Sequence, residues 1–587
     1  MPSYRAPVEE YRFIFDEFLA IDSVAGLRGR EEIGPDIRSH ILDEVGKMCE
    51  REVFPLNRSG DLEGCRLVNG QVVTPRGFKE AYDKLMEGGW AGLSFEPAWG
   101  GQGMPELISI PFDEMLASAN MGFSGYIDIT KAACALLQIQ GSEAQKNLYL
   151  PRLVSGEWAA AMHLTEPQAG TDLGLIRTRA EPQPDGTYRL HGTKIFITGG
   201  DHDLTPNIIS LVLARLPDAP EGSRGISLFL VPKFLVDDDG GLGARNGINA
   251  RRVEHKMGNN SSATCEMVHE ASVGYLVGLP HQGLRAMFIM MNENRLGVAI
   301  QGLAISEIAY QNALAYAQMR VQGRAPDSKG GADTIIRHPD VRRMLAIVKS
   351  FNDGARALTL WTGLQIDLAR HSPDAAEREA ADDLVALLTP VLKSYLTDGG
   401  TDNANLALQC LGGHGYIVDN GLEQYVRDVR ITQIYEGTNG IQALDLLNRK
   451  LKLHQGRLPA RFFALVEERL QRASTIPELA PFAEPLGHAY RELRDATDWV
   501  LQPGNNLDAL AGATDYLRLF ALVAMGWVWT GIARTSLDAL KVNPANADFY
   551  RDKLAIGRFF MSRVPSETAM LASRCRLGNR LLADFPI

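Results

Sequence analysis

The order of helical and β-type patterns along the chain is the feature that most restricts its fold. From Glu31 to about Ala160 the pattern is mainly helical, with turns at Gly and Pro. From His163 to about Pro232 the chain holds short runs of β-forming residues that are separated by Gly, Pro and Asp. Helical patterns return after about Gly278. A β-unit between helical units favours a multidomain α+β protein over an α/β protein.

The length of 587 residues agrees with this division, because about 150 residues per domain is usual. We expect an N-terminal α-helical domain over residues 1–160 and a central β-domain over 161–277. A second α-helical domain is expected over 278–450. A Gly/Pro-containing link then leads to an appended α-helical domain over 451–587, for which the pattern predicts about four helices.

Composition excludes several classes of partner and site. Lys and Arg number 60 and Asp and Glu 71, which gives a net charge of −11 without a basic block, so nucleic acid is not expected as a partner. The six cysteines form no CxxC pair and there is no His cluster, so we expect neither a metal site nor a disulfide framework. The first residues, Met1 to Asp16, lack the pattern of a signal or transit peptide. A cytoplasmic location fits these features.

Two long apolar patterns predict buried helices. The uncharged run Leu519 to Ala533 is shorter than the ~18 residues that span a bilayer, so we interpret it as a buried helix and expect no stable membrane insertion. The proline-free segment Leu284 to Arg320 carries an apolar stripe that is typical of a core-facing helix. That stripe consists of Leu296, Ile300, Leu303, Ala304 and Ile308.

Two segments at the start of the β-domain could hold a ligand. In Ala161–Asp172, Gly170 allows a close backbone approach, and Thr165 and Thr171 offer hydroxyl groups. In the strand pattern Lys194–Gly200, an aromatic residue and a threonine two positions apart share one face, where they could stack on and hydrogen-bond a flat cofactor. A plain turn and an ordinary core strand remain the alternatives.

Two further segments lie in the second helical domain. Gln409–Tyr416 has three glycines in four positions after a helical run that we expect to begin near Thr401, and its amides could hold a pyrophosphate. It lacks the strand-turn-helix context of a dinucleotide fingerprint, and a helix-ending turn is the alternative. The segment Ile431–Gln442 contains Glu436 between a tyrosine and a glycine, which could equally be a solvated loop carboxylate.

Taken in this order, the segments resemble the acyl-CoA dehydrogenase family. Its hallmarks are a TEPxAGSD-like stretch, a (W/F)IT strand, an R-x-x-(F)G element, a QxxGGxG loop and a YEGT motif. They correspond to Thr165–Asp172, Phe196–Gly199, Arg320–Arg324, Gln409–Gly415 and Tyr435–Thr438. The resemblance covers about residues 40 to 450 and implies an α-β-α fold with a barrel-like central domain. It also implies FAD held between that domain and the second helical domain.

The resemblance assigns roles to individual residues. It implies that Glu436 is the catalytic base and that its backbone N–H stabilises the substrate carbonyl oxygen. The implied cofactor contacts are Met162, Leu164, Thr165, Gly170, Thr171, Phe196, Ile197, Thr198, Arg320, Gln322, His338, Gln409, Cys410, Gly412, Gly413, Gly437, Thr438 and Gly440. The implied substrate contacts are Thr171, Met291, Asn294, Arg295 and Glu436.

Some positions depart from the family pattern. Some members take the base from the position of Asn294, which cannot accept a proton here, and Glu293 is a rival one residue away. The aromatic-Gly pair after Arg320 is shortened, which puts the contact at Gln322 in doubt, and the strand aromatic is Phe196 instead of Trp. The appended domain is absent from shorter members. It could cover a subunit edge or line a substrate pocket.

The activity implied is FAD-dependent α,β-dehydrogenation of an acyl-CoA to the trans-2-enoyl-CoA, a reaction of fatty acid metabolism. The long form and the start Met1–Pro7 resemble the branch that acts on 3-(methylthio)propanoyl-CoA, while medium- and long-chain fatty acyl-CoAs stay open. The implied partners are an electron-transfer flavoprotein and further copies of the chain, as a homodimer or dimer of dimers. An oxygen-using acyl-CoA oxidase and a non-catalytic flavin- or CoA-binding scaffold are the alternatives.

Overall fold

The computed structural model describes residues 2–29, 32–237, 239–328 and 330–586. The chain forms two compact units. Unit 1 comprises Met1–Asp43, Pro105–Glu114 and Val298–Ile587, and unit 2 comprises Glu44–Met104 and Met115–Gly297. Three long helices contribute residues to both units: α2 (Pro35–Met48), α5 (Glu106–Gln140) and α7 (Gly283–Met319). The division into four domains stays a prediction.

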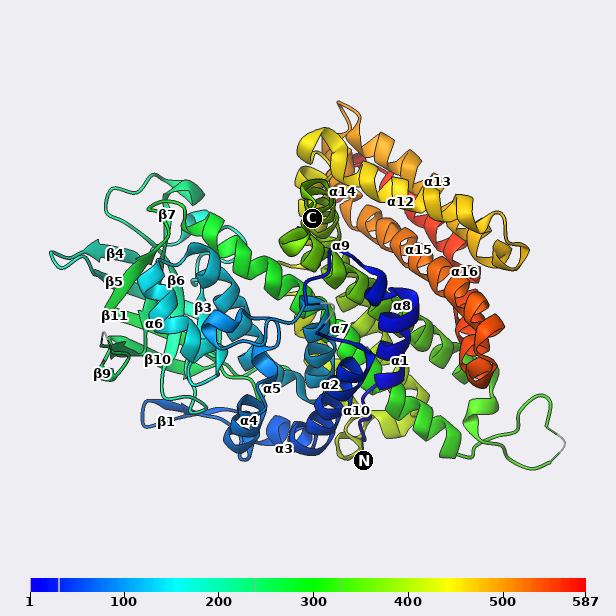
Figure 1. Ribbon diagram of the computed structural model, residues 1–587, viewed down its shortest axis with the longest axis horizontal. Coiled ribbons are helices and arrows are strands. Elements are labelled where there is room, and N and C mark those ends of the chain that lie inside the picture. The colour runs from blue at the N-terminus through cyan, green and yellow to red at the C-terminus, as the bar shows by residue number, and fades with distance from the viewer. Residues whose placement is uncertain (1, 30–31, 238, 329, 587) are drawn as a thin grey trace. The chain divides into compact units, whose positions relative to one another are not determined.

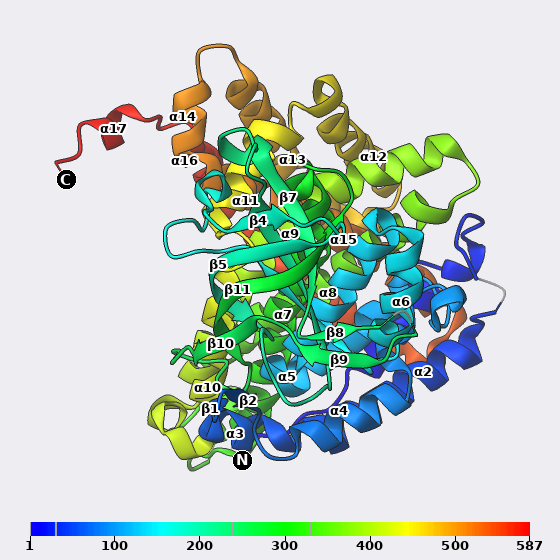
Figure 2. The ribbon, with the colours of Figure 1, turned by 90° about the vertical axis from the view of Figure 1, so that its left-hand side faces the viewer.

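A closed ring of strands forms the centre of unit 2. The strands of this unit are β1 (Arg66–Val68), β2 (Gln71–Val73), β3 (Ala159–His163), β4 (Arg179–Pro182), β5 (Tyr188–Thr198), β6 (Ile208–Arg215), β7 (Ile226–Pro232), β8 (Phe234–Val236), β9 (Leu242–Arg245), β10 (Ile248–Val253) and β11 (Thr264–Val277). Strands β1 and β2 form one separate two-stranded sheet, and β8 and β9 form another. Within the described residues, the main sheet follows the order β10-β11-β5-β4-β6-β3, and β7 pairs with both β11 and β6. The ring β11-β5-β4-β6-β7 is thereby closed, which confirms the expected barrel-like domain. Figure 2 shows strands β4, β5, β7 and β11 of this ring.

The pairing of β5 with β11 contains a bulge beside the expected cofactor strand. The register shifts between Cys265 and Met267, and Phe196 has a left-handed φ of 61°. A bulge interrupts the alternation of side chains along a strand. Phe196 is exposed and Ile197 buried, and the expected placement of Phe196 and Thr198 on one strand face stays a prediction. The sequence gives no sign of a bulge, because Phe is a favourable strand residue.

Unit 2 also contains helices. They are α3 (Pro55–Glu63), α4 (Phe78–Glu87), α6 (Glu143–Val154) and the parts of α2, α5 and α7 in this unit. The start of α6 is fixed by a capping box, in which Ser142 accepts from the Gln145 N–H and the Gln145 side chain accepts from the Ser142 N–H. Trp158, Leu211 and Met287 belong to one continuous core that joins the strands to α5, α6 and α7.

Unit 1 is helical in its described part. Its helices are α1 (Val8–Arg12), α8 (Pro339–His371), α9 (Ala375–Cys410), α10 (Leu422–Val429), α11 (Asn439–Asp445), α12 (Arg457–Ala473), α13 (Ala480–Leu501), α14 (Asn506–Ala511), α15 (Ala513–Val542), α16 (Ala547–Cys575) and α17 (Arg580–Ala583). The helix before Gln409 begins at Ala375, capped by the Asp374 side chain, so the expected start near Thr401 was wrong. The polar run Thr401–Asn405 looked like a helix start but lies within α9.

Helices α7 and α9 approach each other closely in unit 1. A Cβ at Gly302 would lie 2.5 Å from the Leu396 carbonyl oxygen, and one at Gly400 would lie 2.3 Å from that of Gly302. Side chains at either position would force the two helices apart. This contact matters for the site, because Lys393 of α9 and Gln301 of α7 both contact the loop that carries Glu436.

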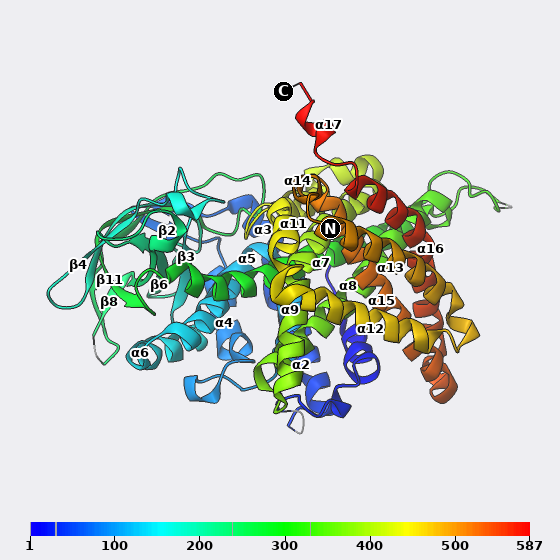
Figure 3. The same ribbon diagram turned by 90° about the horizontal axis from the view of Figure 1, so that it is seen from above.

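The appended segment packs on the preceding bundle. Helices α13, α15 and α16 lie side by side, and α15 and α16 contact α8 and α9 (Figures 1 and 3). Trp529 of α15 is fully buried and donates to the Ser350 carbonyl of α8 at 3.2 Å. By length and composition α15 is the one described helix that could cross a membrane, but 94% of its apolar window is buried. The prediction that Leu519–Ala533 is a buried helix is confirmed.

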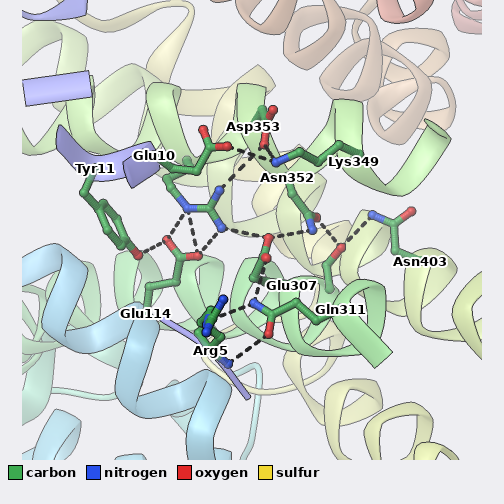
Figure 4. Close-up of polar contacts among 12 residues, drawn as sticks. Arg5, Glu10, Tyr11, Glu114, Glu307, Gln311, Lys349, Asn352, Asp353 and Asn403 are labelled. Carbon is green, nitrogen blue, oxygen red and sulfur yellow. Dashed lines mark hydrogen bonds and ion pairs between the residues drawn. The ribbon is translucent and has the colours of Figure 1, made fainter. Parts of the chain in front are cut away.

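A buried ionic network joins several helices of unit 1 (Figure 4). Arg356 of α8 donates to Glu114 of α5 at 2.6 Å and to Glu307 of α7 at 2.9 Å. Lys349 pairs with Glu10 at 3.0 Å, and Lys553 of α16 also binds Glu10. The network therefore attaches the N-terminal segment and the appended segment to the same bundle.

Candidate active site

The loop that carries Glu436 has an unusual backbone. Glu436 has φ +56° and Gly437 has φ +85°, so two consecutive residues are left-handed. This conformation costs a non-glycine residue about 1–2 kcal/mol, and it persists only where surrounding contacts hold it. The loop lies between a 3₁₀ turn at Arg430–Gln433 and α11, whose N-cap Thr438 accepts from the Ile441 N–H. The side chain of Glu436 is partly buried.

Side chains from three helices hold this loop. Lys393 of α9 donates to the Gly437 carbonyl at 2.8 Å. Gln442 of α11 donates to the carbonyls of Glu436 at 3.0 Å and Gly437 at 3.1 Å. The hydroxyl of Tyr435 donates to Gln301 of α7. Lys393, Gln442 and Gln301 are buried, and none of them follows from the motif that predicted the loop.

Asn439 extends these contacts into the interior of unit 1. Its side-chain oxygen accepts from Lys393 at 2.9 Å, and its amide donates to Asp398 at 2.7 Å and to Thr397 at 3.0 Å. Asp398 also accepts from Gln433 at 2.5 Å. The asparagine of the sequence Thr-Asn-Gly was the available signal for this arrangement. The partners on α9 lie more than forty residues earlier, where no local pattern marks them.

A second group in unit 1 brings together the predicted pyrophosphate ligands. Arg320 lies near Gln322, with 3.4 Å between their side chains, and the His338 ring lies 2.8 Å from the Gln322 carbonyl oxygen. A bridge between Val321 and Thr334 closes this hairpin-like loop. The structure therefore gathers the three predicted residues despite the shortened motif.

The Gln409 loop belongs to the same region of unit 1. Gly412 and Gly413 begin a 3₁₀ turn and are exposed, with no atom within 4 Å of a Cβ built on either. The ring of His414 in this turn lies 6.0 Å from Tyr316 near the end of α7. Burial and then the charge of Asp340, near His338, raise the pKa of Cys410 to about 11. Cys410 is therefore a neutral, buried thiol.

In unit 2, Glu166 organises the Thr165–Asp172 segment. Its carboxylate accepts from the Lys194 ammonium at 2.8 Å, from the Arg177 N–H at 2.7 Å and from the Thr178 hydroxyl at 2.6 Å. Lys194 also donates to the Leu164 carbonyl at 3.0 Å. Burial opposes ionisation of both partners, but Lys194 holds the pKa of Glu166 at about 2, and burial lowers the pKa of Lys194 to about 8. The pair is ionised at neutral pH and fixes the turn.

Two buried histidines support the same segment from β3 and β11. The His163 ring lies 3.2 Å from the His269 ring, and His269 lies 3.1 Å from the Ser272 hydroxyl. Burial lowers the pKa of both, to about 3 for His269, so both rings are neutral. They support the strand rather than carry charge to a ligand.

The predicted ligand-facing residues of unit 2 differ in exposure. Phe196 is 61% exposed, whereas Ile197 is buried. Thr198 and Thr165 are partly buried, and Gly170 and Thr171 are exposed. An exposed aromatic on a bulge is costly to leave in water, which is consistent with a flat ligand that covers it.

The predicted substrate residues of α7 also lie in unit 2. Asn294 and Arg295 are buried, and the Asn294 amide lies 4.0 Å from the sulfur of Met162. Met291 and Met162 pack against the same core. Met162 and Asn294 are therefore neighbours, as the two sets of predicted contacts require. Glu293 is partly buried.

The donor chemistry fits FAD in both units. Unit 2 offers Phe196 as a stacking surface, with Thr198 two residues along the strand. Unit 1 offers Arg320, His338 and open glycine amides, which suit a diphosphate. No group of three or more potential metal ligands occurs among the residues that the structure describes.

The ion pair of Glu166 gives a testable stability effect. Replacing Lys194 by Met should lower the free energy of unfolding by about 2–3 kcal/mol, because a buried carboxylate loses its cation but keeps its other donors. The matched control is Lys79→Met, which removes an exposed pair with Asp83 and should cost under about 1 kcal/mol. Calorimetry of both variants checks this, and equal melting temperatures would contradict it.

Comparisons with known proteins identify the family of the chain. Models of the acyl-CoA dehydrogenase N-terminal, middle and C-terminal domains match residues 38–157, 161–272 and 281–451, and a model described as acetyl-CoA dehydrogenase C-terminal like matches 462–586. The chain is 41% identical to 3-methylmercaptopropionyl-CoA dehydrogenase of Ruegeria pomeroyi over 99% of both chains.

Two solved structures share the fold. Caenorhabditis elegans ACDH-11 in complex with C11-CoA has a TM-score of 0.79 at 22% identity, over 100% of this chain and 96% of that one. An acyl-CoA dehydrogenase from Bacillus anthracis complexed with FAD has a TM-score of 0.73 at 20% identity, over 100% and 93%. The chain therefore belongs to the acyl-CoA dehydrogenase family of FAD-dependent oxidoreductases, in a long form with an extra C-terminal domain.

Proposed function

We propose that this protein dehydrogenates 3-(methylthio)propanoyl-CoA or a similar short acyl-CoA, with Glu436 as the base, and passes electrons to an electron-transfer flavoprotein. The observation that carries the proposal is the Glu436 loop, whose left-handed backbone is held by buried donors in the motif typical of the family. The similarity to the Ruegeria pomeroyi enzyme, which covers 99% of both chains, supports the choice of substrate.

The reaction requires a base beside the α-carbon of the thioester. Such a proton is weakly acidic, so the carboxylate must be positioned before it reacts, and a rigid loop supplies this better than a mobile one. Glu436 removes the α-proton and holds it on its carboxyl group. Asn294 cannot take this part, because an amide does not accept a proton at neutral pH.

Negative charge develops on the thioester carbonyl oxygen as the proton leaves. The backbone N–H of Glu436 donates to that oxygen in this proposal, so one residue both removes the proton and stabilises the resulting charge. Lys393 and Gln442 donate hydrogen bonds to the carbonyl oxygens of the same loop, and these bonds fix the direction of its N–H groups. When bound, FAD supplies the acceptor for the β-hydride.

The remaining predicted residues are proposed to bind and orient. Arg320, Gln322 and His338 would hold the FAD diphosphate with the Gln409–Gly413 loop, and Phe196 and Thr198 would meet the flavin ring. Met291, Asn294 and Arg295 would face the acyl-CoA. We also propose a homodimer or dimer of dimers in the cytoplasm. The exposed apolar residues Tyr416, Ile417 and Val418 support a subunit contact, and light scattering would measure the mass.

Substrate and acceptor are tested with a panel of acyl-CoAs. We expect flavin reduction in the absence of oxygen to be fastest with 3-(methylthio)propanoyl-CoA and butanoyl-CoA, and at least about tenfold slower with long-chain acyl-CoA, a difference of about 1.4 kcal/mol. Faster reduction by long chains would overturn the choice of substrate. Reoxidation should be rapid with the flavoprotein acceptor and slow in air, whereas rapid hydrogen peroxide formation would indicate an oxidase.

A further inference from the structure

The hydrogen bonds that hold the Glu436 backbone point to a residue that affects the reaction by holding this backbone in place. Lys393 is fully buried in α9, and its ammonium lies 2.8 Å from the Gly437 carbonyl and 2.9 Å from the Asn439 side chain. Burying an ammonium group is costly unless its hydrogen bonds are well made. A cation therefore occupies the interior directly beneath a loop whose backbone is strained.

The strain has a clear location. Glu436 is one of few described non-glycine residues with positive φ, and Gly437 next to it has φ +85°. Released from its contacts, Glu436 would relax toward negative φ, which residues other than glycine favour. Such a change is a rotation about the N–Cα bond of Glu436, and it redirects the side chain. The contacts that prevent this rotation therefore fix the position of the carboxylate.

Three hydrogen bonds from two side chains reach the carbonyls of Glu436 and Gly437, and the two side chains come from two sides. Lys393 approaches from α9, and the Gln442 amide approaches from α11, 3.0 Å from the Glu436 carbonyl and 3.1 Å from that of Gly437. Asn439 joins the two sides, because it accepts from Lys393 and donates to Asp398 and Thr397. Lys393 is the charged centre of this arrangement, and a charged donor is roughly twice as strong as a neutral one.

We propose that Lys393 is a positioning residue for the reaction: it holds the Glu436–Gly437 backbone in its left-handed conformation and so places the carboxylate. The inference rests on the proposed role of Glu436 as the base. Lys393 contacts the loop backbone and does not take part in proton transfer. Its loss should therefore slow the chemical step and leave substrate binding largely intact.

The test compares Lys393→Met with Lys393→Gln in the full-length, FAD-loaded protein. For Lys393→Met we expect the rate of flavin reduction at saturating butanoyl-CoA to fall about 10- to 100-fold, while the half-saturating concentration changes less than about threefold. Lys393→Gln keeps a donor near the carbonyl and should recover part of the rate. Equal rates in both variants and the unchanged protein would overturn the proposal.

A second readout does not depend on activity. In the FAD-free protein, amide hydrogen exchange of the segment 434–442 should accelerate in Lys393→Met, because the loop loses its hydrogen bonds from Lys393. The structural control is Lys553→Met, which removes another buried lysine of unit 1 and should lower stability without changing exchange in this segment or the reduction rate of the folded protein. Unchanged exchange at 434–442 in Lys393→Met would contradict the proposal.

Two further variants separate the possible failures. If Lys393→Met does not fold, Gln442→Met removes the donors from the α11 side and should give the same split between rate and binding. Glu436→Gln runs beside them. If Glu436→Gln keeps its activity, the proposed base is wrong. If Glu436→Gln is inactive but neither Lys393→Met nor Gln442→Met slows reduction, the base stands and the positioning role fails.

Discussion

Replacing Glu436 by Gln should lower the rate of flavin reduction by acyl-CoA about 10³- to 10⁴-fold. The amide has nearly the same size as the carboxylate but cannot accept the α-proton, so the loss equals the contribution of general-base catalysis. Such a loss corresponds to about 4–5 kcal/mol of transition-state stabilisation. Stopped-flow reduction without oxygen measures it. FAD content and acyl-CoA binding should stay close to those of the unchanged protein.

The control for this variant is Glu293→Gln. Glu293 is adjacent in the sequence to Asn294, the position from which some family members take their base, and it is partly buried on α7. We expect a change in rate below about threefold, because the neighbouring Asn294 leaves no base at that position. If Glu293→Gln greatly lowers the rate of flavin reduction while Glu436→Gln keeps it, Glu293 and not Glu436 is the base. Activity retained in both would favour the scaffold alternative.

Replacing Arg356 by Met should cause the largest loss of stability among single changes in unit 1. Arg356 is 1% exposed and serves two buried carboxylates: Glu114, which also accepts from Tyr11 at 2.6 Å, and Glu307. Although burial would lower it, Glu114 and Glu307 raise the pKa of Arg356 far above its ordinary value. The guanidinium is therefore charged, and its removal leaves two uncompensated carboxylates in the interior.

Breaking one such buried pair typically costs about 3–5 kcal/mol. This variant breaks the two hydrogen-bonded pairs and also removes a longer ion pair with Asp353 at 3.8 Å. We expect a loss at or above that range, seen as a lower melting temperature or as failure to accumulate folded protein. The matched control is Arg472→Met, which removes an exposed pair with Glu468 and should cost under about 1 kcal/mol. Adding Glu114→Gln and Glu307→Gln to Arg356→Met should restore part of the stability. No recovery would mean that lost packing, and not unpaired charge, causes the effect.

The helices and strands whose apolar residues form a regular pattern could be predicted from the sequence. The stripe from Leu296 to Ile308 identified α7, and the observed helix ends one residue before the predicted Arg320. The region from His163 to about Pro232, predicted to hold β-type runs, contains β6 and β7, because apolar runs bound by turn residues are typical of strands. Motif residues such as Glu436 could be predicted for a different reason, because the family motifs occur in a fixed order along the chain.

The contacts that hold the site could not be predicted. Lys393 looks like an ordinary helix residue, and only the close packing of α7 and α9 brings α9 beneath the loop. The bulge at Phe196 depends on the register with β11, which the strand itself does not specify. Glu10 resembles a solvated charge at the N-terminus but is a partly buried partner of Lys349 and Lys553. Each of these results from tertiary pairing between distant segments.

One measurement tests the central claim most directly. The FAD-loaded protein is mixed, without oxygen, with one equivalent of 3-(methylthio)propanoyl-CoA or butanoyl-CoA, and both the flavin absorbance and the acyl product are followed. We predict loss of the oxidised flavin absorbance together with formation of the trans-2-enoyl-CoA, up to one product per flavin, and neither change on this timescale with Glu436→Gln. Flavin that stays oxidised with every acyl-CoA, or enoyl-CoA formed equally well by Glu436→Gln, would contradict the account.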